Sequence, residues 1–90
     1  MISRLQIETA YKLSTNYWSP GRGGAVLGFE LELGEDLPTR TYLVIGFNGK
    51  IKLCDYNDWL SFIGTEIDLK EAERLIKLHN KIQNELKVFT

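Results

Sequence analysis

The sequence has little of what several classes of protein need. Its 90 residues include one cysteine, one histidine and one methionine. A single cysteine excludes a disulfide scaffold and a cysteine-rich zinc site, because both need several thiols. It also fits a reducing compartment, so we expect a cytoplasmic protein. We expect neither a metal nor another cofactor, because no cluster of metal-ligating side chains has a suitable spacing.

Long hydrophobic runs and an excess of either charge are also absent. The longest nearly apolar run, Tyr42 to Phe47, is far below the roughly 18 residues of a membrane helix. Eleven Lys and Arg against twelve Asp and Glu give a net charge of −1. This balance argues against binding nucleic acid by bulk charge and against an acidic mimic of DNA. The length and average composition predict one globular domain over residues 1–90.

The first half of the chain alternates between apolar and polar residues with a period of two, which predicts half-buried strands. We expect a first strand over residues 3–14 and a loop over residues 15–24, where glycine and proline interrupt regular structure. Further strands are expected over residues 27–33, 41–47 and 50–54. Asn48-Gly49 predicts a two-residue type I′ turn between the last two, because both positions tolerate a positive φ.

The second half changes to helical spacing. Residues 57–64 predict a short helix, capped by Asp55 or Asn57 and ended by Gly64. Asp68 begins a capping-box pattern that leads into an amphipathic helix of about 20 residues. The order predicts an α+β fold: a four-stranded antiparallel meander, then the short helix and the long C-terminal helix packed on one sheet face. The strand positions expected to face that helix are Leu5, Ile7, Leu27, Phe29, Leu31, Leu43, Ile45, Ile51 and Leu53.

Groups suited to catalysis are few. Cys54 lies on an expected strand and His79 on the expected last helix, and no feature indicates an activated thiolate between them. We interpret Cys54 as a packing residue and His79 as a partly buried imidazole bonded to a backbone group. Glu30 and Glu32 share one strand face, which is typical of a solvated sheet surface; acid–base work and a cation site are the alternatives. We therefore do not expect an enzyme.

The aromatic, glycine-rich segment over residues 16–24 is the main candidate for a binding site. Tyr17, Trp18 and Arg22 belong to residue types that are enriched in interface hot spots and that stack on single-stranded nucleic acid. A competing interpretation lets the Trp18 ring cover an open edge of the core. The expected partner-binding residues are Tyr17, Trp18, Arg22, Tyr42, Lys50 and Lys52.

The leading interpretation is a small non-enzymatic regulatory protein that contacts a protein partner through this loop. Inhibitors and accessory proteins of phages and mobile elements are often of this size. The alternative is a single-stranded nucleic-acid-binding domain that uses the same loop with Lys50 and Lys52, although the mixed charge of the sheet face counts against it. A homodimer is a further alternative, because it can close a sheet edge. No membrane partner is expected.

One resemblance points toward nucleic acid. Four antiparallel strands followed by a helix with a Trp just inside it, in residues 53–60, resemble the transcriptional-coactivator and whirly group of single-stranded DNA binders. In that group a basic β surface carries the DNA, so the resemblance implies a nucleic-acid-binding sheet. The corresponding charges in this chain are mixed, and no binding residue is carried over.

Overall fold

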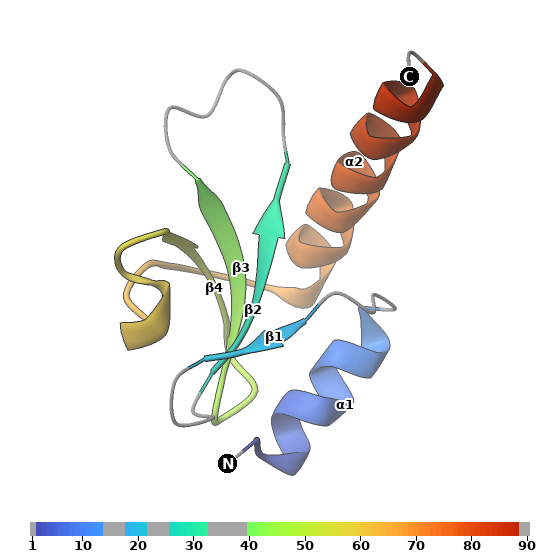
Figure 1. Cartoon of the computed structure of the whole chain (residues 1–90). Coiled ribbons are helices and arrows are strands. Elements are labelled where there is room, and N and C mark those ends of the chain that lie inside the picture. The colour runs from blue at the N-terminus through green and yellow to red at the C-terminus, as the bar shows by residue number, and fades with distance from the viewer. Residues whose placement is uncertain (1, 14–17, 22–25, 33–39, 89–90) are drawn as a thin grey trace.

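The chain has the predicted α+β fold, in which helices pack on one face of an antiparallel sheet (Figure 1). The computed structural model describes residues 2–13, 18–21, 26–32 and 40–88, and residues 86–88 as backbone alone. The elements in chain order are α1 (Arg4–Lys12), β1 (Ser19–Pro20), β2 (Val26–Leu31), β3 (Thr41–Gly46), β4 (Ile51–Asp55), the 3-10 turn η2 (Trp59–Ser61), β5 (Thr65–Ile67) and α2 (Leu69–Val88). The five strands pair in chain order, so the meander has one strand more than the sequence predicts.

The first element is a helix, and the strand predicted over residues 3–14 is wrong. The Ser3 hydroxyl accepts a hydrogen bond from the Gln6 backbone N–H at 3.2 Å, and the Gln6 side chain accepts one from the Ser3 N–H at 2.7 Å. This capping box satisfies two donors that a helix N-terminus otherwise leaves unpaired. The Ser-x-x-Gln spacing therefore predicts the observed helix, whereas the period-two alternation predicts a strand that does not form.

The alternating apolar residues of α1 also do not face the core. Leu5, Ile7 and Tyr11 are 52%, 58% and 86% exposed. The helix instead buries Leu13 just beyond its end, together with the polar side chain of Gln6. Because these apolar residues lie in solvent, their alternation does not mark a buried face, and the strand predicted from it is wrong.

The hairpin between β3 and β4 is confirmed, but its turn differs from the predicted one. Gly49 has a positive φ of 82° and Asn48 does not, whereas a type I′ turn needs both. The Gly49 N–H donates to the Gly46 carbonyl at 2.9 Å, and the Gly46 N–H donates to the Lys50 carbonyl at 2.9 Å. These bonds define a three-residue loop that ends in a left-handed glycine.

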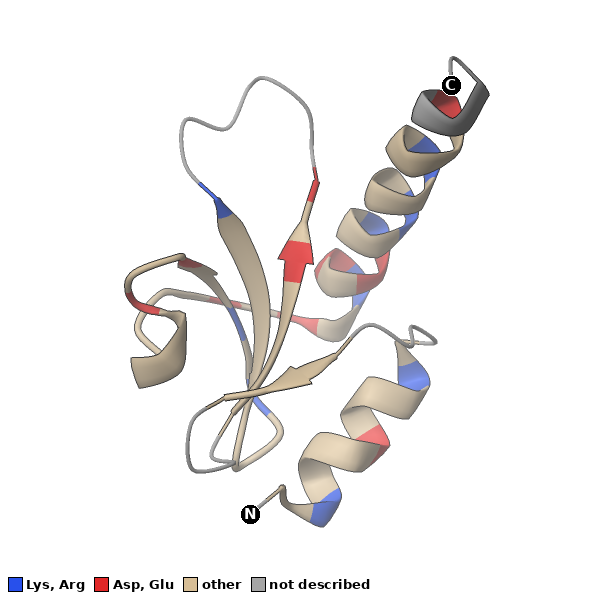
Figure 2. Ribbon diagram, in the orientation of Figure 1, with Lys and Arg blue, Asp and Glu red and all other residues tan. Residues whose placement is uncertain are grey.

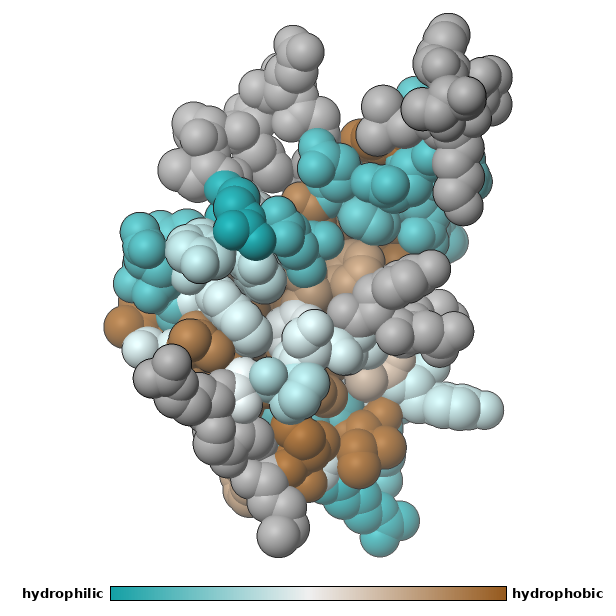
Figure 3. Space-filling view, viewed as in Figure 1, coloured by the Kyte–Doolittle hydropathy of each residue, from teal (hydrophilic) through white to brown (hydrophobic). Residues whose placement is uncertain are grey.

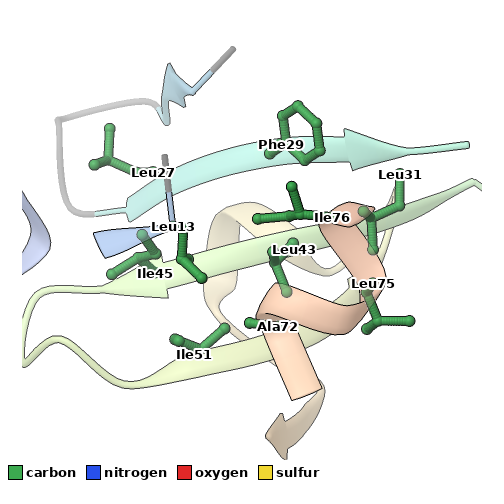
Figure 4. Close-up of a cluster of buried hydrophobic side chains, with 10 residues drawn as sticks. All are labelled: Leu13, Leu27, Phe29, Leu31, Leu43, Ile45, Ile51, Ala72, Leu75 and Ile76. Carbon is green, nitrogen blue, oxygen red and sulfur yellow. The ribbon is translucent and has the colours of Figure 1, made fainter. Parts of the chain in front are cut away.

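The main core lies between the sheet and the two helices (Figure 4). Its strand members occupy odd-numbered positions on β2, β3 and β4, as the sequence predicts for this part of the sheet. The C-terminal helix begins as predicted, because the Asp68 carboxylate accepts the Glu71 N–H at 2.8 Å. The buried residues of this cluster are Leu13, Leu27, Phe29, Leu31, Leu43, Ile45, Ile51, Ala72, Leu75 and Ile76. Among the described helices, none is long and apolar enough to cross a membrane.

The opposite sheet face has a smaller cluster, which the segment between β4 and β5 covers. Its buried members are Val26, Val44 and Cys54, and the partly buried rings packed on them are Tyr42, Trp59 and Phe62. The predicted helix over residues 57–64 is only the turn η2, and Phe62, at a φ of 55°, ends it in place of Gly64. Trp59 thus lies in a turn between two strands, which removes the element order behind the whirly resemblance.

Candidate functional site

The structure separates the residues predicted to bind a partner. Tyr17 and Arg22 lie outside the described residues. Trp18 is half-buried and packs against the main core, with its ring centroid 5.7 Å from that of Phe29. Tyr42 packs on the opposite sheet face. Trp18 and Tyr42 therefore do not form one surface with a common orientation.

The cationic and aromatic groups of that opposite face already have intramolecular partners. Tyr42 stacks on Trp59 with centroids 4.8 Å apart and an interplanar angle of 3°. The Lys52 ammonium donates to the Phe62 backbone carbonyl at 3.2 Å, and it lies 4.5 Å from the centroid of the Phe62 ring. Lys50 lies 3.6 Å from Glu66, as an exposed ion pair. The charged groups of Lys50 and Lys52 are therefore already bound by other groups of the same chain.

The outer edge of β2 is the feature that sequence analysis missed. Strand β1 pairs Ser19 with Gly28 and Pro20 with Leu27, and it begins at Ser19. The described part of β1 therefore pairs with the first half of β2. The sequence predicts a loop over residues 15–24, and β1 lies inside that range; this part of the prediction is wrong because a Ser-Pro pair has no strand signature.

The outward direction of the β2 backbone follows from two hydrogen bonds. The Val26 carbonyl accepts the Gly21 N–H at 2.7 Å, and the Glu32 N–H donates to Nδ1 of His79 at 2.8 Å. Both groups belong to even-numbered residues and point away from β3. Since backbone groups alternate in direction along an antiparallel strand, the N–H and the carbonyl of Glu30 also point outward.

A cleft of about 740 Å³ opens beside this edge. Figure 1 shows that α2 slants away from β2 toward its C-terminal end, and Figure 3 shows mostly hydrophilic side chains along α2 in this view. The α2 wall contributes one imidazole and three uncharged amides. The residues that line the cleft are Ser19, Gly28, Phe29, Glu30, Tyr42, His79, Asn80, Gln83 and Asn84.

His79 forms the inner end of the α2 wall. Its ring packs edge-on against Phe29, with centroids 4.9 Å apart and an interplanar angle of 71°. Because Nδ1 accepts the Glu32 N–H, the ring is neutral and carries its proton on Nε2. Burial lowers the pKa of His79, and the nearby Glu32 carboxylate opposes this shift. The interpretation of His79 as an imidazole bonded to a backbone group is confirmed.

Glu30 lies on the opposite wall, and Arg40 holds its carboxylate. Both guanidinium contacts with the Glu30 carboxylate are 2.9 Å, and Arg40 lies 4.3 Å from the centroid of the Tyr56 ring. The hydrogen bond from Arg40 lowers the pKa of Glu30, so this carboxylate is ionised at neutral pH. A carboxylate held in this way is poorly suited to general acid–base catalysis. Within the described ranges, no three His, Cys, Asp or Glu side chains gather where they could hold a metal ion.

Cys54 takes no part in the cleft. Its thiol is buried in the cluster on the sheet face opposite the main core, and burial raises its pKa to about 11. His79 packs on Phe29, on the other side of the sheet, so the two do not form a nucleophile and base. A protonated, buried thiol is typical of a packing residue.

In comparisons with known proteins, the chain matches no protein-family model, no curated protein and no solved structure.

Proposed function

We propose that this chain is a small non-enzymatic binding protein whose protein partner docks in the cleft beside β2. One observation carries the proposal: a cleft of about 740 Å³ lies between the outer side of β2 and α2, with the amide side chains of Asn80, Gln83 and Asn84 in its lining. This proposal keeps the predicted class of function and moves the contact from the glycine-rich loop to the cleft.

The chemistry of the lining supports binding over catalysis. Among the described residues of the lining, the one carboxylate, Glu30, is held by Arg40, and the one imidazole, His79, is held by the Glu32 N–H. The remaining α2 groups are amides, which donate and accept hydrogen bonds but do not titrate. A wall of fixed charges and amides is suited to recognising a polar chain.

The test uses peptides selected on the purified protein from a displayed library of random sequences. Asn80→Trp places an indole in the cleft and should weaken binding of the selected peptides by at least about ten-fold. Lys81→Trp adds the same side chain at the next exposed helix position, which is not part of the lining, and should leave affinity within about two-fold. Equal effects of the two variants, or a selection that yields no binder, would contradict the proposal.

Single-stranded nucleic acid remains the second candidate function. The supporting observation is that Tyr42, Tyr56 and Arg40 lie within stacking distance of one another beside the cleft, with Arg40 4.3 Å from the Tyr56 ring. Aromatic rings and Arg are the groups that stack on bases. However, Glu30 binds Arg40, and Figure 2 shows acidic and basic residues mixed along α2.

An oligonucleotide titration separates the two candidates. Tyr56→Ala removes an exposed ring and should abolish the quenching of tryptophan fluorescence by a mixed-sequence oligonucleotide, if such quenching occurs. Nucleic-acid binding should also weaken steeply as salt rises, because phosphate contacts release counterions. No quenching at low salt would exclude this candidate.

A further inference from the structure

We infer that the cleft recognises a carboxamide side chain, Asn or Gln, of the docked partner, and that His79 and Gln83 are the residues that select it. The inference rests on the proposed function and specifies the chemistry of the partner at one position. It starts from two half-buried groups of the α2 wall, Nε2–H of His79 and the side-chain amide of Gln83. Neither group makes a hydrogen bond to another described residue.

The backbone fixes the direction in which His79 can form hydrogen bonds. The Glu32 N–H can only donate, so Nδ1 accepts it at 2.8 Å and Nε2 carries the ring proton. In the part of the chain that the structure describes, the one buried side-chain nitrogen or oxygen without a partner is Nε1 of Trp18. Nε2 of His79 is therefore open to solvent. A group docked in the cleft meets it as a donor and must supply an acceptor.

Gln83 lies one helical turn beyond His79, in the same row of side chains. Residues four apart on a helix have their Cβ atoms about 5–6 Å from each other. Both of these side chains are half-buried, whereas Asn80 and Asn84, in the adjacent row, are exposed. The inner row of the α2 wall therefore offers a fixed donor and, one turn away, an amide oxygen that can accept.

A carboxamide fits this row because its carbonyl and one of its N–H groups point in the same direction. The oxygen accepts the His79 Nε2–H, and the N–H donates to Oε1 of Gln83. A trans peptide group directs its carbonyl and its N–H to opposite sides, so the main chain of a partner cannot satisfy both residues with one peptide group.

Charge distinguishes a carboxamide from a carboxylate of the same shape. A carboxylate could also accept from both residues, because the Gln83 amide can turn its NH₂ group toward it. The negative charge of Glu32 reaches His79, however, and Glu32 forms no ion pair with another described residue. The other nearby carboxylate, Glu30, is neutralised by Arg40. A docked Asp or Glu would therefore lie beside an uncompensated like charge, which lowers affinity.

Nitrogen NMR of the imidazole tests the donor without any substitution. His79 is the one histidine of the 90-residue chain, so its Nε2–Hε2 signal is assigned unambiguously. The protein is saturated with a peptide selected from the displayed random library. Binding should slow the exchange of Hε2 with water and move its resonance downfield, because the proton enters a hydrogen bond. A peptide that binds in the cleft and leaves this signal unchanged would overturn the inference.

Substitution in the selected peptides tests the acceptor. These peptides should share an Asn or Gln at one position. Replacing that residue by Leu, or by the Asp or Glu of the same shape, should weaken binding by at least about five-fold, because groups of the site lose their partners or meet a like charge. Selected peptides that share no carboxamide, or that tolerate both replacements, would overturn the inference.

Two protein variants test the selecting residues. Glu32→Gln removes the charge and keeps the backbone N–H, so the acidic peptide should come within about three-fold of the carboxamide peptide. Gln83→Leu removes the amide and should reduce the preference for carboxamide over Leu in the peptide, since the two substitutions remove the same bond. Lys81→Leu, at an exposed position outside the lining, is the control and should leave both preferences unchanged. Preferences that are the same in all three variants would contradict the assignment.

The outcomes also separate this inference from the proposed function. If Asn80→Trp weakens binding while the His79 signal and the peptide substitutions show no carboxamide recognition, the cleft binds partners through other groups and only the inference fails. If binding is insensitive to Asn80→Trp, or no peptide is selected, the proposed function fails and the inference fails with it.

Discussion

The two helices are fixed to the same core by different interactions. The C-terminal helix α2 contributes three apolar residues to the core, Ala72, Leu75 and Ile76, each at most 6% exposed. The first helix α1 has its one fully buried side chain at the polar Gln6, which is 0% exposed. Burial of apolar area tolerates small displacements, whereas hydrogen bonds fix distance and direction. The comparison implies that α2 supplies most of the stability and that α1 is positioned by geometry.

Two side chains in the described part of the chain, Gln6 and Ser3, attach α1 through hydrogen bonds. Gln6 accepts the Ser3 N–H and donates to the Ile45 carbonyl at 3.0 Å, inside the core layer. The Ser3 hydroxyl accepts the Gln6 N–H and donates to the Phe47 carbonyl at 2.6 Å. The helix is thereby bound to β3 and to the hairpin that follows it. Loss of either side chain should displace α1 while leaving α2 in place.

The largest expected effect is on the apolar attachment. Leu75→Ala should lower the free energy of unfolding by about 2–5 kcal/mol, because it removes buried methyl groups and leaves a cavity. Chemical denaturation monitored by circular dichroism measures the change. Leu78→Ala, at a position on the same helix that is 36% exposed, is the matched control and should cost clearly less. Similar losses at the two positions would contradict the account of α2.

Gln6→Ala should have the next largest effect, a loss of about 1–3 kcal/mol, because it removes the hydrogen bonds of a buried side chain to the Ile45 carbonyl and the Ser3 N–H. Amide exchange should rise throughout α1 and remain nearly unchanged in α2. Gln6→Glu sharpens the test, since the second carboxylate oxygen would face the Ile45 carbonyl. An equally stable Gln6→Glu protein at neutral pH would show that the side-chain amide is not required.

Ser3→Ala should cost about 1 kcal/mol, a typical value for the loss of an N-cap side chain. Ser3→Asp can replace the cap acceptor but not the hydroxyl that donates to Phe47, so it separates the two roles of Ser3. If Ser3→Asp restores full stability, the contact with Phe47 contributes little. The measurement is the thermal unfolding temperature of the wild type, Ser3→Ala and Ser3→Asp, with Gln6→Ala as the reference for the larger loss.

The same comparison explains which parts of the fold are predictable from sequence. The helix α2 has both its cap, Asp68, and its apolar stripe in sequence, and the two agree. In α1 they conflict, because the Ser3 and Gln6 cap indicates a helix while the alternation of Leu5 and Ile7 indicates a strand. The cap predicts the observed helix. The alternation fails because the buried residue of α1 is Gln6, a polar residue that a hydrophobic pattern does not count as part of the core.

The candidate site was less predictable for a related reason. The part of β2 that β1 covers depends on where β1 begins, and β1 begins at Ser19 without any sequence signal. The role of His79 was predictable in part. Its place on an apolar helix face indicated a buried imidazole, but its partner, the Glu32 N–H, lies 47 positions away in the sequence. Contacts over that separation follow from tertiary packing alone.

Acid pH should weaken the contact between α2 and the edge of β2. The pKa of His79 is lowered from its ordinary value of 6.5 in the folded state, so the unfolded chain binds more protons as pH falls below that value. The contribution of neutral His79 to the free energy of unfolding is therefore fully present above pH 6.5, and it is lost as pH falls toward the lowered pKa. His79→Phe should remove this part of the pH dependence. An unchanged profile in the variant would assign it to other groups.

The smallest expected effect concerns the apolar side chains that α1 leaves exposed, some of which lie over α1 in the lower part of Figure 3. Ile7→Ser changes a residue that is 58% exposed and should alter the free energy of unfolding by no more than about 0.5 kcal/mol. The measurement is made at two protein concentrations, because a second copy that covered this face would make stability depend on concentration. A concentration-dependent loss in the wild-type protein that disappears in Ile7→Ser would show that α1 is attached by apolar burial after all, against a partner chain. Equal stability at both concentrations would leave Gln6 and Ser3 as the groups that hold α1.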